Sequence, residues 1–173
     1  MPQIMSTDNP ALDAQPDRVD RELIRLLQES GRMTLAELAR HVGMSSPGVS
    51  ERLRRLEQSG VISGYGAVVD PYRLGYRLHA FVRLATFSPV SARPELDRVM
   101  ERPEVIEAHH VVGEDCWIFK VIVRDTTHLE DLLLDFARVG TTTTSIVLSS
   151  PVNGRAVTPA DEVGGAEPAG GVR

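Results

Sequence analysis

Apolar residues recur with a helical period in two short stretches between residues 34 and 60. Four of them in the first stretch fall at i, i+3, i+4 and i+7 on one helix face: Leu35, Leu38, Ala39 and Val42. Thr34 followed by Glu37 is the pattern of a capping box, which gives the chain a reason to begin a helix there. Gly43 follows the last apolar position and can end the helix in a left-handed conformation. The pattern predicts a short amphipathic helix.

A second helix is predicted directly after that glycine. Ser45 or Ser46 can cap it, and Pro47 suits its first turn, where an N–H group has no intrahelical partner. Its apolar side contains Val49, Leu53 and Leu56, and the polar side begins with small residues and continues with arginines. Such a helix can bring its N-terminal end close to base edges while the arginines reach phosphates or a guanine. For Arg52, on the flank of the apolar stripe, we expect a structural hydrogen-bonding role.

A leading helix completes a three-helix pattern. Asp17 can cap a segment that ends at Gly31 and has Val19, Leu23, Leu26 and Leu27 at helical spacing. Residues 18–60 contain eight Arg and six acidic residues, a net charge of +2, whereas the whole chain carries −5. Attraction to nucleic acid is therefore expected only at this end of the chain. Two short helices around a glycine also occur in ordinary helical bundles, so the pattern alone leaves both readings open.

The period changes to that of strands after Gly60. The alternation predicts strands at 61–69, 77–87, 105–112, 117–123 and 142–150, and helices at 91–102 and 128–139. Residues 113–115, Gly-Glu-Asp, look like a hairpin turn. From residue 77 onward the order is β-α-β-β-α-β, the ferredoxin-like arrangement of four antiparallel strands backed by two helices. One face of such a sheet stays open, and self-association is the simplest way to cover it.

The fold class predicted is therefore α+β, with a winged-helix-like helix-turn-helix domain before a ferredoxin-like domain. We expect a tail at 1–16, the helix-turn-helix domain at 17–62, a linker strand and connector at 63–76, the sheet domain at 77–152 and a second tail at 153–173. Both tails are rich in Pro, Gly, Ala, Asn and Asp without apolar periodicity, which predicts disorder.

Composition sets the wider limits. The 173 residues, 42% of them hydrophobic, can hold one ordinary domain or two small ones. Neither a signal peptide nor an apolar run near 18 residues is present, so we expect no secretion and no membrane insertion. A lone cysteine, Cys116, cannot form an internal disulfide, and a cytoplasmic protein is the expectation.

Candidate catalytic or metal chemistry is sparse. His109 and His110 are neighbours on a predicted strand and point to opposite faces, so they cannot jointly bind one metal without distortion. The chain has no phosphate-binding GxxxxGK loop, GxSxG elbow or HExxH helix. We therefore expect no catalytic residues, no metal site and no cofactor. Trp117 is expected to pack in the core or at an interface.

Over residues 13–152 the chain resembles the Lrp/AsnC (feast/famine) family of transcriptional regulators. The resemblance rests on the order along the chain of Leu35-Ala36-Glu37-Leu38-Ala39, the segment SSPGVSERLRRL at 45–56, Gly60-Val61-Ile62, Leu74-Gly75-Tyr76, Val111-Val112-Gly113-Glu114 and TTTTSIVLSS at 141–150. It implies an N-terminal helix-turn-helix, a linking strand and a C-terminal domain that forms a homodimer and often a larger assembly, up to an octamer. It also implies that an amino acid or related small molecule binds between the C-terminal domains of neighbouring dimers.

Carried onto this sequence, the recognition helix of the family is residues 45–58. The residues expected to contact double-stranded DNA are Ser46, Pro47, Ser50, Arg54 and Arg55. The expected effector-binding residues are Gly113, Glu114, Asp115, Thr142, Thr143, Thr144 and Ser145. A zwitterionic amino acid needs N–H groups and hydroxyls for its carboxylate and an acceptor for its ammonium, which these residues provide.

The sequence departs from the family at the turn. Many members have Gly-x-x-Asp-aromatic there, whereas this chain has Cys116 in place of the aspartate, with Asp115 one position earlier. Near a strand, a shift of one position sends the side chain to the opposite face, so the role of the aspartate does not carry over to Asp115. A Gly-acid-acid turn and a threonine-rich strand are also common structural features.

Two classes of function follow. The favoured class is a sequence-specific, DNA-binding transcriptional regulator, not an enzyme, with a small-molecule-sensing domain. The alternative is a ferredoxin-like metabolite-binding module or enzyme, whose N-terminal helices serve only protein contacts, because this fold alone does not define a function.

Overall fold

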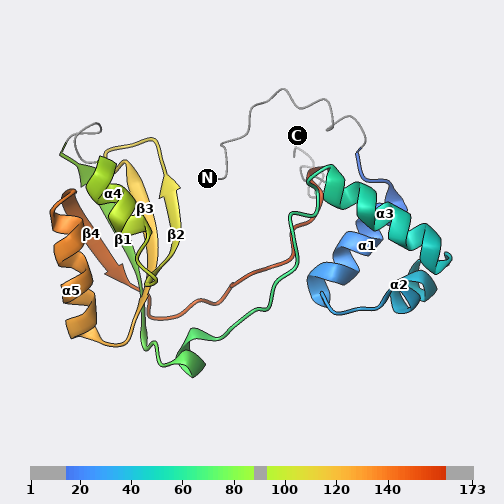
Figure 1. Ribbon diagram of the computed structural model, residues 1–173, viewed down its shortest axis with the longest axis horizontal. Coiled ribbons are helices and arrows are strands. Elements are labelled where there is room, and N and C mark those ends of the chain that lie inside the picture. The colour runs from blue at the N-terminus through green and yellow to red at the C-terminus, as the bar shows by residue number, and fades with distance from the viewer. Residues whose placement is uncertain (1–14, 88–92, 163–173) are drawn as a thin grey trace, which may run out of the picture. The chain divides into compact units, whose positions relative to one another are not determined.

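The computed structural model describes residues 15–87 and 93–162 and forms two compact units. The first unit contains the chain up to Ala67 together with the stretch from Gly154 onward, and the second runs from Val68 to Asn153. In the described part of the chain, the first unit has three α-helices and the second has a four-stranded sheet with two α-helices (Figure 1).

All three N-terminal helices begin at the caps that the sequence predicts. Helix α1, Arg18–Glu29, follows Asp17, whose carboxylate accepts the backbone N–H groups of Val19 and Asp20 at 2.8 and 2.9 Å. Helix α2, Leu35–Val42, has the predicted capping box: Thr34 N donates to the Glu37 carboxylate at 2.7 Å, and Glu37 N donates to Thr34 Oγ1 at 3.3 Å. Helix α3, Ser46–Gln58, follows Ser45, whose Oγ accepts Gly48 N at 3.3 Å.

The apolar faces of these helices meet in one core. Leu23, Leu38 and Val49, one from each helix, are at most 1% exposed. Their burial, at roughly 1.5–3 kcal/mol for each large apolar side chain, stabilises helices that are too short to persist alone in water. The polar side of α3 is left at the surface.

The strand predicted at 61–69 is wrong. Residues 61–69 have no strand assignment, and Val68 is fully exposed. The chain supplies no neighbouring strand there in the described residues, so the segment has no strand to pair with, although Ile62 packs against the core of the N-terminal helices. Tyr65 instead donates a hydrogen bond to Glu57 of α3 at 2.9 Å, and burial together with this bond raises the pKa of Tyr65 to about 12.

The second unit has the predicted ferredoxin-like topology. A 3-10 turn, η2 (Pro71–Leu74), precedes β1 (Leu78–Thr86), α4 (Arg93–Met100), β2 (Val105–His110), β3 (Trp117–Val123), α5 (Thr126–Ala137) and β4 (Gly140–Ile146). The strand order is β2-β3-β1-β4 and every neighbouring pair is antiparallel. The first two residues of the helix predicted at 91–102 lie outside the described residues.

Strand β4 begins earlier than predicted because Gly140 permits a close approach. A Cβ at Gly140 would lie 2.0 Å from the carbonyl oxygen of Ala85, so only glycine fits against β1 at this point. Pairing therefore starts with Gly140 opposite Thr86 and ends with Ile146 opposite Ala80. The predicted continuation to residue 150 is not part of the strand.

The two helices cover one face of the sheet (Figure 1). Ala80, Val82 and Leu84 of β1 are fully buried on that side, where they belong to one core with Phe119 and Phe136. The opposite face carries the alternate residues of each strand, among them Phe81, Arg83, Lys120, Thr143 and Ser145. We call this second face the open face. Phe81 is 40% exposed there although it lies on a central strand.

Residues 153–162, part of the tail predicted to be disordered, make contacts with α1 in the structure. Gln28 of α1 donates to the carbonyl of Val157 at 3.0 Å and accepts its N–H at 2.7 Å. Arg21 pairs with Asp161 at 2.7 Å, and a short 3-10 helix spans Ala160–Glu162. The composition of the tail did not indicate these contacts, because a single amide side chain can bond an extended backbone segment that has no apolar periodicity. Residues 1–14 and 163–173 lie outside the described residues.

Candidate functional site

The N-terminal end of α3 presents small residues at the surface. Pro47 and Ser50 are exposed, and Ser46 is half-buried beside them. A side chain at Gly48 would be tightly packed, because a Cβ would lie 3.1 Å from Met44 Cε and 3.3 Å from Ser45 Oγ. This end of α3 has no long side chain in its first turn, so it can approach a flat or grooved surface closely.

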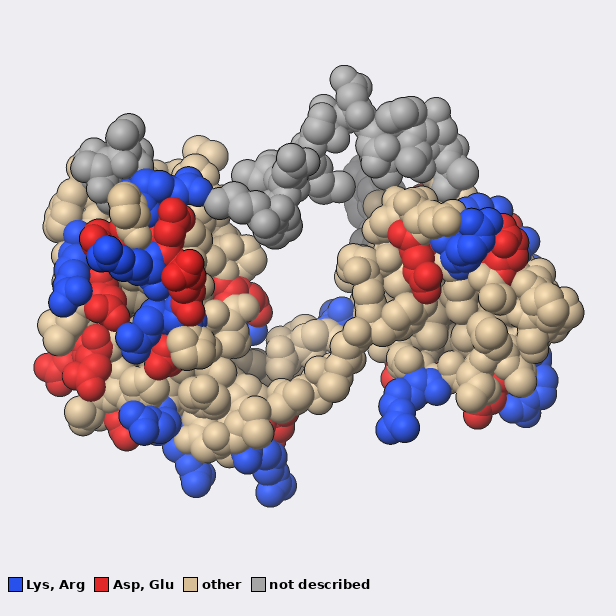
Figure 2. Space-filling view, in the orientation of Figure 1, with Lys and Arg blue, Asp and Glu red and all other residues tan. Residues whose placement is uncertain are grey.

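Arg54 lies on the same outward side but is held within its own helix. Its guanidinium bonds both carboxylate oxygens of Glu51, one of them at 3.0 Å, and Gln58 Oε1 at 2.8 Å. The bond from Arg54 lowers the pKa of Glu51. Figure 2 shows Lys/Arg and Asp/Glu side chains close together over the N-terminal helices. The carboxylate of Glu51 therefore balances the positive charge of Arg54 within the same helix.

Arg52 and Arg55 both reach back to α1. Arg52 Nη1 contacts Asp17 Oδ2 at 2.6 Å and Asp20 Oδ1 at 2.8 Å, which confirms the structural role expected of it. Arg55 Nη2 contacts Asp20 Oδ2 at 2.8 Å, although the Arg55 side chain is 55% exposed. The sequence did not predict this second contact, because the capping pattern identified Asp17 and gave no signal that Asp20 would face α3. That Arg55 contacts DNA stays a prediction.

The predicted effector turn joins β2 to β3. Val111 N donates to the carbonyl of Cys116 at 2.9 Å, and Cys116 N donates to the carbonyl of Leu84 at 3.0 Å. Gly113 and Glu114 are exposed, and the space where a Gly113 side chain would lie is empty to 4 Å. The turn thus lies at the end of the sheet where β1 ends and β4 begins, with β1 between it and Thr142 and Thr143 of β4.

The strand register divides the four predicted hydroxyl residues between the two faces. Thr142 and Thr144 lie opposite Leu84 and Val82, which point into the core, and both threonines are half-buried. Thr143 and Ser145 lie opposite Arg83 and Phe81 on the open face, and both are exposed. Only Thr143 and Ser145 of the four thus present their side chains on the open face.

Arg83 also lies on the open face, close to Thr143 and Asp115, although the sequence did not predict a role for it. Its Nη1 lies 3.5 Å from Asp115 Oδ2, and in the register it faces Thr143. Asp115 therefore reaches the open face in spite of the one-residue shift in the turn. The alternation of β1 could have revealed Arg83, because the charged residue stands between the buried Val82 and Leu84.

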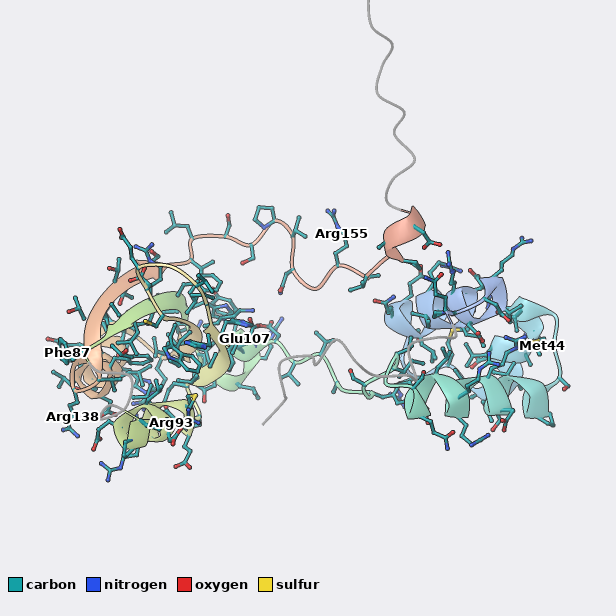
Figure 3. All side chains as sticks on the ribbon, turned by 90° about the horizontal axis from the view of Figure 1, so that it is seen from above. Met44, Phe87, Arg93, Glu107, Arg138 and Arg155 are labelled. Atoms are coloured by element: carbon teal, nitrogen blue, oxygen red, sulfur yellow. The ribbon has the colours of Figure 1, made fainter. Side chains whose placement is uncertain are left out.

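Other predicted residues have structural partners. Trp117 stacks on Phe119 with ring centroids 5.9 Å apart and packs against the core, as expected. His110 lies against Trp117 on the helix-covered side, while His109 contacts Glu107, so the two histidines point to opposite faces as predicted. Glu107 lies on edge strand β2, and Arg93 lies on α4 (Figure 3). Cys116 is a half-buried free thiol. Among residues 15–87 and 93–162, no group of three or more His, Cys, Asp or Glu is arranged to hold a metal ion.

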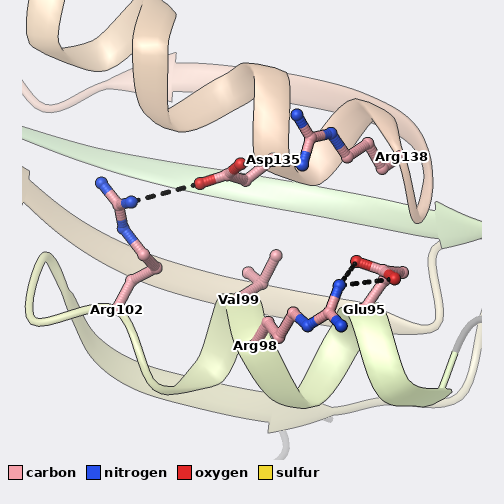
Figure 4. Close-up of a pocket in the computed structure, with 6 residues that line it drawn as sticks. All are labelled: Glu95, Arg98, Val99, Arg102, Asp135 and Arg138. Carbon is pink, nitrogen blue, oxygen red and sulfur yellow. Dashed lines mark hydrogen bonds and ion pairs between the residues drawn. The ribbon is translucent and has the colours of Figure 1, made fainter.

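A pocket of about 210 Å³ lies between α4 and α5, on the side of the domain away from the open face. Its lining has Val99 at the base and charged groups around it (Figure 4). Arg98 bonds both oxygens of Glu95 at 2.8 and 2.9 Å, and Arg102 lies 3.3 Å from Asp135. Its charged groups already pair with one another.

Beneath this pocket, Glu104 is a buried acid with several donors. Burial raises the pKa of Glu104, but hydrogen bonds from its own backbone N–H, His128 and Arg102 outweigh burial and lower it. His128 Nε2 lies 2.9 Å from Glu104 Oε1, and His128 Nδ1 accepts from Arg124, so Nε2 carries the proton. This network ties α5 to the segment between α4 and β2.

No helix in the described part of the chain is long and apolar enough to cross a bilayer.

Comparison with known proteins agrees with this geometry in both units. Residues 16–63 match the family model for winged helix-turn-helix DNA-binding, and residues 80–157 match the model for the Lrp/AsnC ligand binding domain. The chain is 39% identical over 117 residues to the HTH-type transcriptional regulator LrpA of Mycobacterium tuberculosis, covering 68% of this chain and 78% of that protein. It is 35% identical over 134 residues to the uncharacterized HTH-type regulator YezC of Bacillus subtilis, covering 78% and 94%.

Two solved structures are similar over most of the chain. The feast or famine regulatory protein of M. tuberculosis, complexed with L-methionine, superposes with a TM-score of 0.75 at 35% identity and covers 84% of this chain and all of that one. A transcriptional regulator of Neisseria meningitidis in complex with L-Met gives 0.78 at 26% identity and covers 86% and 99%. The chain therefore belongs to the Lrp/AsnC family of helix-turn-helix transcriptional regulators.

Proposed function

We propose that this protein binds double-stranded DNA as a homodimer through α3 and changes its binding when an amino acid occupies the C-terminal domain. The observation that carries the proposal is that one chain contains two features. The first is a helix whose exposed N-terminal end consists of small residues, and the second is a sheet with an open face. The family to which the chain belongs supports the same reading and favours a regulator over an enzyme. Action in the cytoplasm stays a prediction.

DNA contact is assigned to the outward side of α3. Ser46, Pro47 and Ser50 lie where the helix can enter the major groove, and Arg54 and Arg55 follow one to two turns later. Residues 18–60 of one copy carry a net charge of only +2, so useful affinity requires two recognition helices acting together on one duplex. A dimer with a two-fold axis would read a pseudo-palindrome with half-sites spaced by whole helical turns.

Ser50→Glu tests this assignment. A carboxylate at that position would meet phosphates or acceptor edges, so affinity for a duplex taken from upstream of the chain's own coding sequence should fall at least ~10-fold. The matched control is Ser30→Glu, which makes the same substitution at an exposed residue directly after α1 and should cost less than about 3-fold. Equal losses in fluorescence anisotropy titrations would remove the N-terminal end of α3 from the interface.

Dimerisation is assigned to the open face. Phe81 on a central strand, together with the exposed Val68 and Val69 in the extended connector, leaves apolar surface that a second copy can cover. Larger assemblies, tetramers or octamers, would add contacts between dimers. The family's effector position between neighbouring dimers would then place the turn at Gly113 close to another copy.

The amino-acid effector is assigned to the turn and the open-face end of β4. Arg83 and the hydroxyls of Thr143 and Ser145 suit a carboxylate, and Asp115 or Glu114 suits an ammonium. Gly113 leaves open space for the ligand backbone. Thr142 and Thr144 belong to the same predicted set, but they point toward the helices and act at most by shaping the strand.

Two neighbouring threonines give a matched test. L-methionine and each other common amino acid are screened by thermal shift, where saturation at 100 times Kd adds ~2.7 kcal/mol to the free energy of unfolding. The ligand-induced rise in melting temperature should disappear in Thr143→Val and persist in Thr144→Val. A rise that Thr144→Val loses and Thr143→Val keeps would place the ligand on the helix side, and no rise with any amino acid would contradict the effector proposal.

A further inference from the structure

Asp20 is a buried carboxylate in the first turn of α1, only 2% exposed. Such a group is costly to bury unless donors surround it. Three donors do: the backbone N–H of Asp17 at 3.2 Å, Arg52 Nη1 at 2.8 Å and Arg55 Nη2 at 2.8 Å. Two of these three come from α3, so a single carboxylate joins the leading helix to the predicted recognition helix.

The two arginines constrain how α3 is rotated. Arg52 and Arg55 are three residues apart, so their side chains leave the helix about 60° apart around its axis. Both end on the same carboxylate, one on each oxygen, and Arg52 also reaches Asp17 Oδ2 at 2.6 Å. Turning α3 about its axis would lengthen one of the bonds to Asp20. Because Pro47 and Ser50 lie on the same helix, these ion pairs also fix the direction in which they face.

The guanidinium group of Arg55 is bonded to Asp20 on one side, and the side chain is otherwise exposed. Its bond to Asp20 uses Nη2, and the side chain is 55% exposed. A guanidinium has five N–H donors in a rigid fork, so Nη1 and Nε can still donate to an acceptor from outside. A side chain already fixed in one orientation loses less entropy when it binds a phosphate.

We infer that Asp20 is a positioning residue for DNA binding: it orients Arg55 so that the outer edge of its guanidinium meets a phosphate, and with Arg52 it sets the rotation of α3. The inference rests on the proposed function, in which α3 contacts DNA. It differs from a purely stabilising role, because it makes the effect of Asp20 on DNA affinity depend on Arg55. It also differs from simple neutralisation of Arg55, which would make Asp20 an inhibitor of binding.

The experiment is a double-mutant cycle of Asp20→Asn and Arg55→Ala in the full chain. Affinity is measured by fluorescence anisotropy on the upstream duplex and on a scrambled duplex of the same composition. Circular dichroism at the assay temperature verifies that each variant is folded. The matched control is Glu22→Gln, which removes the same charge from α1 at a carboxylate that pairs with Arg25 on that helix and not with α3.

Asp20→Asn is expected to weaken binding to the upstream duplex about 5- to 10-fold relative to Glu22→Gln. In the Arg55→Ala background, Asp20→Asn should decrease log K by less than half of the decrease that it causes when Arg55 is present. Arg55→Ala alone should lower the slope of log K against log salt concentration by about 0.9, the value of one phosphate contact. A loss that is the same in both backgrounds would show a merely structural role, and tighter binding by Asp20→Asn than by Glu22→Gln would show neutralisation. Either result overturns the inference.

Arg55→Lys provides a test that leaves Asp20 with a cationic partner if Asp20→Asn does not fold. Lysine keeps the charge but lacks the planar fork, so the salt slope should stay unchanged while affinity falls at least ~3-fold. Unchanged affinity would contradict the inference. If the wild-type protein binds neither duplex, the proposed function fails and this inference with it. If it binds and the cycle shows no coupling, only this inference fails.

Discussion

The helical N-terminal unit and the sheet-containing C-terminal unit differ in what each leaves unpaired at its surface. In the N-terminal unit, the arginines of α3 are bonded to acids of the same unit: Arg54 to Glu51, and Arg52 and Arg55 to Asp20. The C-terminal sheet, in contrast, leaves Phe81 40% exposed on a central strand. One copy therefore pairs the arginines of α3 within its own N-terminal unit, whereas its sheet leaves apolar surface exposed.

This difference indicates where regulation can enter. A helix whose charges are balanced internally gains little from long-range attraction to DNA, so its affinity depends on how many copies are linked. In the proposed function the sheet controls that number, because a second copy covers its open face. The group of Arg83, Asp115 and Thr143 lies on that same face, so a ligand there would act directly on assembly.

The sharpest way to break this comparison is to disrupt one core at a time. Leu38→Ala should lower the free energy of unfolding of the N-terminal unit by ~2–5 kcal/mol, and Phe136→Ala should lower that of the C-terminal unit by ~3–5 kcal/mol, because both side chains are at most 1% exposed. Trp117, the single tryptophan, reports on the C-terminal unit alone, whereas circular dichroism reports on both.

In urea titrations, Leu38→Ala should shift the dichroism transition and leave the Trp117 fluorescence transition in place. Phe136→Ala should shift the fluorescence transition. If Leu38→Ala moved the fluorescence midpoint by the same amount as the dichroism midpoint, the two units would unfold as one and the comparison would not hold.

A second prediction concerns the open face. Phe81→Glu places a charge on apolar surface that a partner should bury, and we expect the dimer to weaken by ~2–4 kcal/mol. The control is Leu134→Glu on α5, which is 60% exposed on the helix side and should leave the dimer intact. Light scattering at micromolar concentration should give at least twice the chain mass of 19.0 kDa for the wild type and the control. A wild-type monomer, or equal loss in both variants, would remove the open face as the interface.

The smallest expected effect is the pH dependence of the α1 cap. The hydrogen bond from the Asp20 backbone N–H, helped by Arg52, lowers the pKa of Asp17 below its usual value. A carboxyl group with a lowered pKa in the folded state stabilises the fold above its unfolded pKa of about 4 and loses that contribution as pH falls through the folded value. Because Asp17 is half-exposed, solvent screening keeps the effect under ~1 kcal/mol.

Asp17→Asn isolates the charge, since asparagine is also a good cap. The difference in unfolding free energy between wild type and Asp17→Asn, measured by dichroism in urea, should be largest above pH 4 and shrink as the pH falls below 4. A difference that is constant across this range would assign the effect to geometry instead of charge.

The helices of the N-terminal unit were predictable because their signals are local. Thr34 and Glu37 form their capping box within four residues, and Ser45 caps α3 within its first turn. The ferredoxin-like order was predictable for a related reason: β1 and β4 alternate between a more buried and a more exposed side. The segment at 61–69 has a similar alternation but no partner strand in the described chain, so the same signal gave a wrong strand.

The candidate sites depended on contacts that distant residues make, and the sequence revealed them only in part. Nothing local shows that Asp20 meets Arg55, 35 residues away, or that Gln28 holds the backbone of Val157. The division of Thr142–Ser145 between two faces follows from alternation, but which face each takes depends on the register with β1. Family resemblance supplied the region of each site, and the structure supplied its geometry.

The most direct test of the central claim is an anisotropy titration of the wild-type protein on the upstream duplex and on its scrambled counterpart over a range of salt concentrations. The account predicts at least ~10³-fold tighter binding to the upstream duplex, with affinity falling as salt rises. It also predicts that an amino acid which raises the melting temperature shifts this affinity. Equal binding to the two duplexes at every salt concentration, with no response to that amino acid, would contradict it.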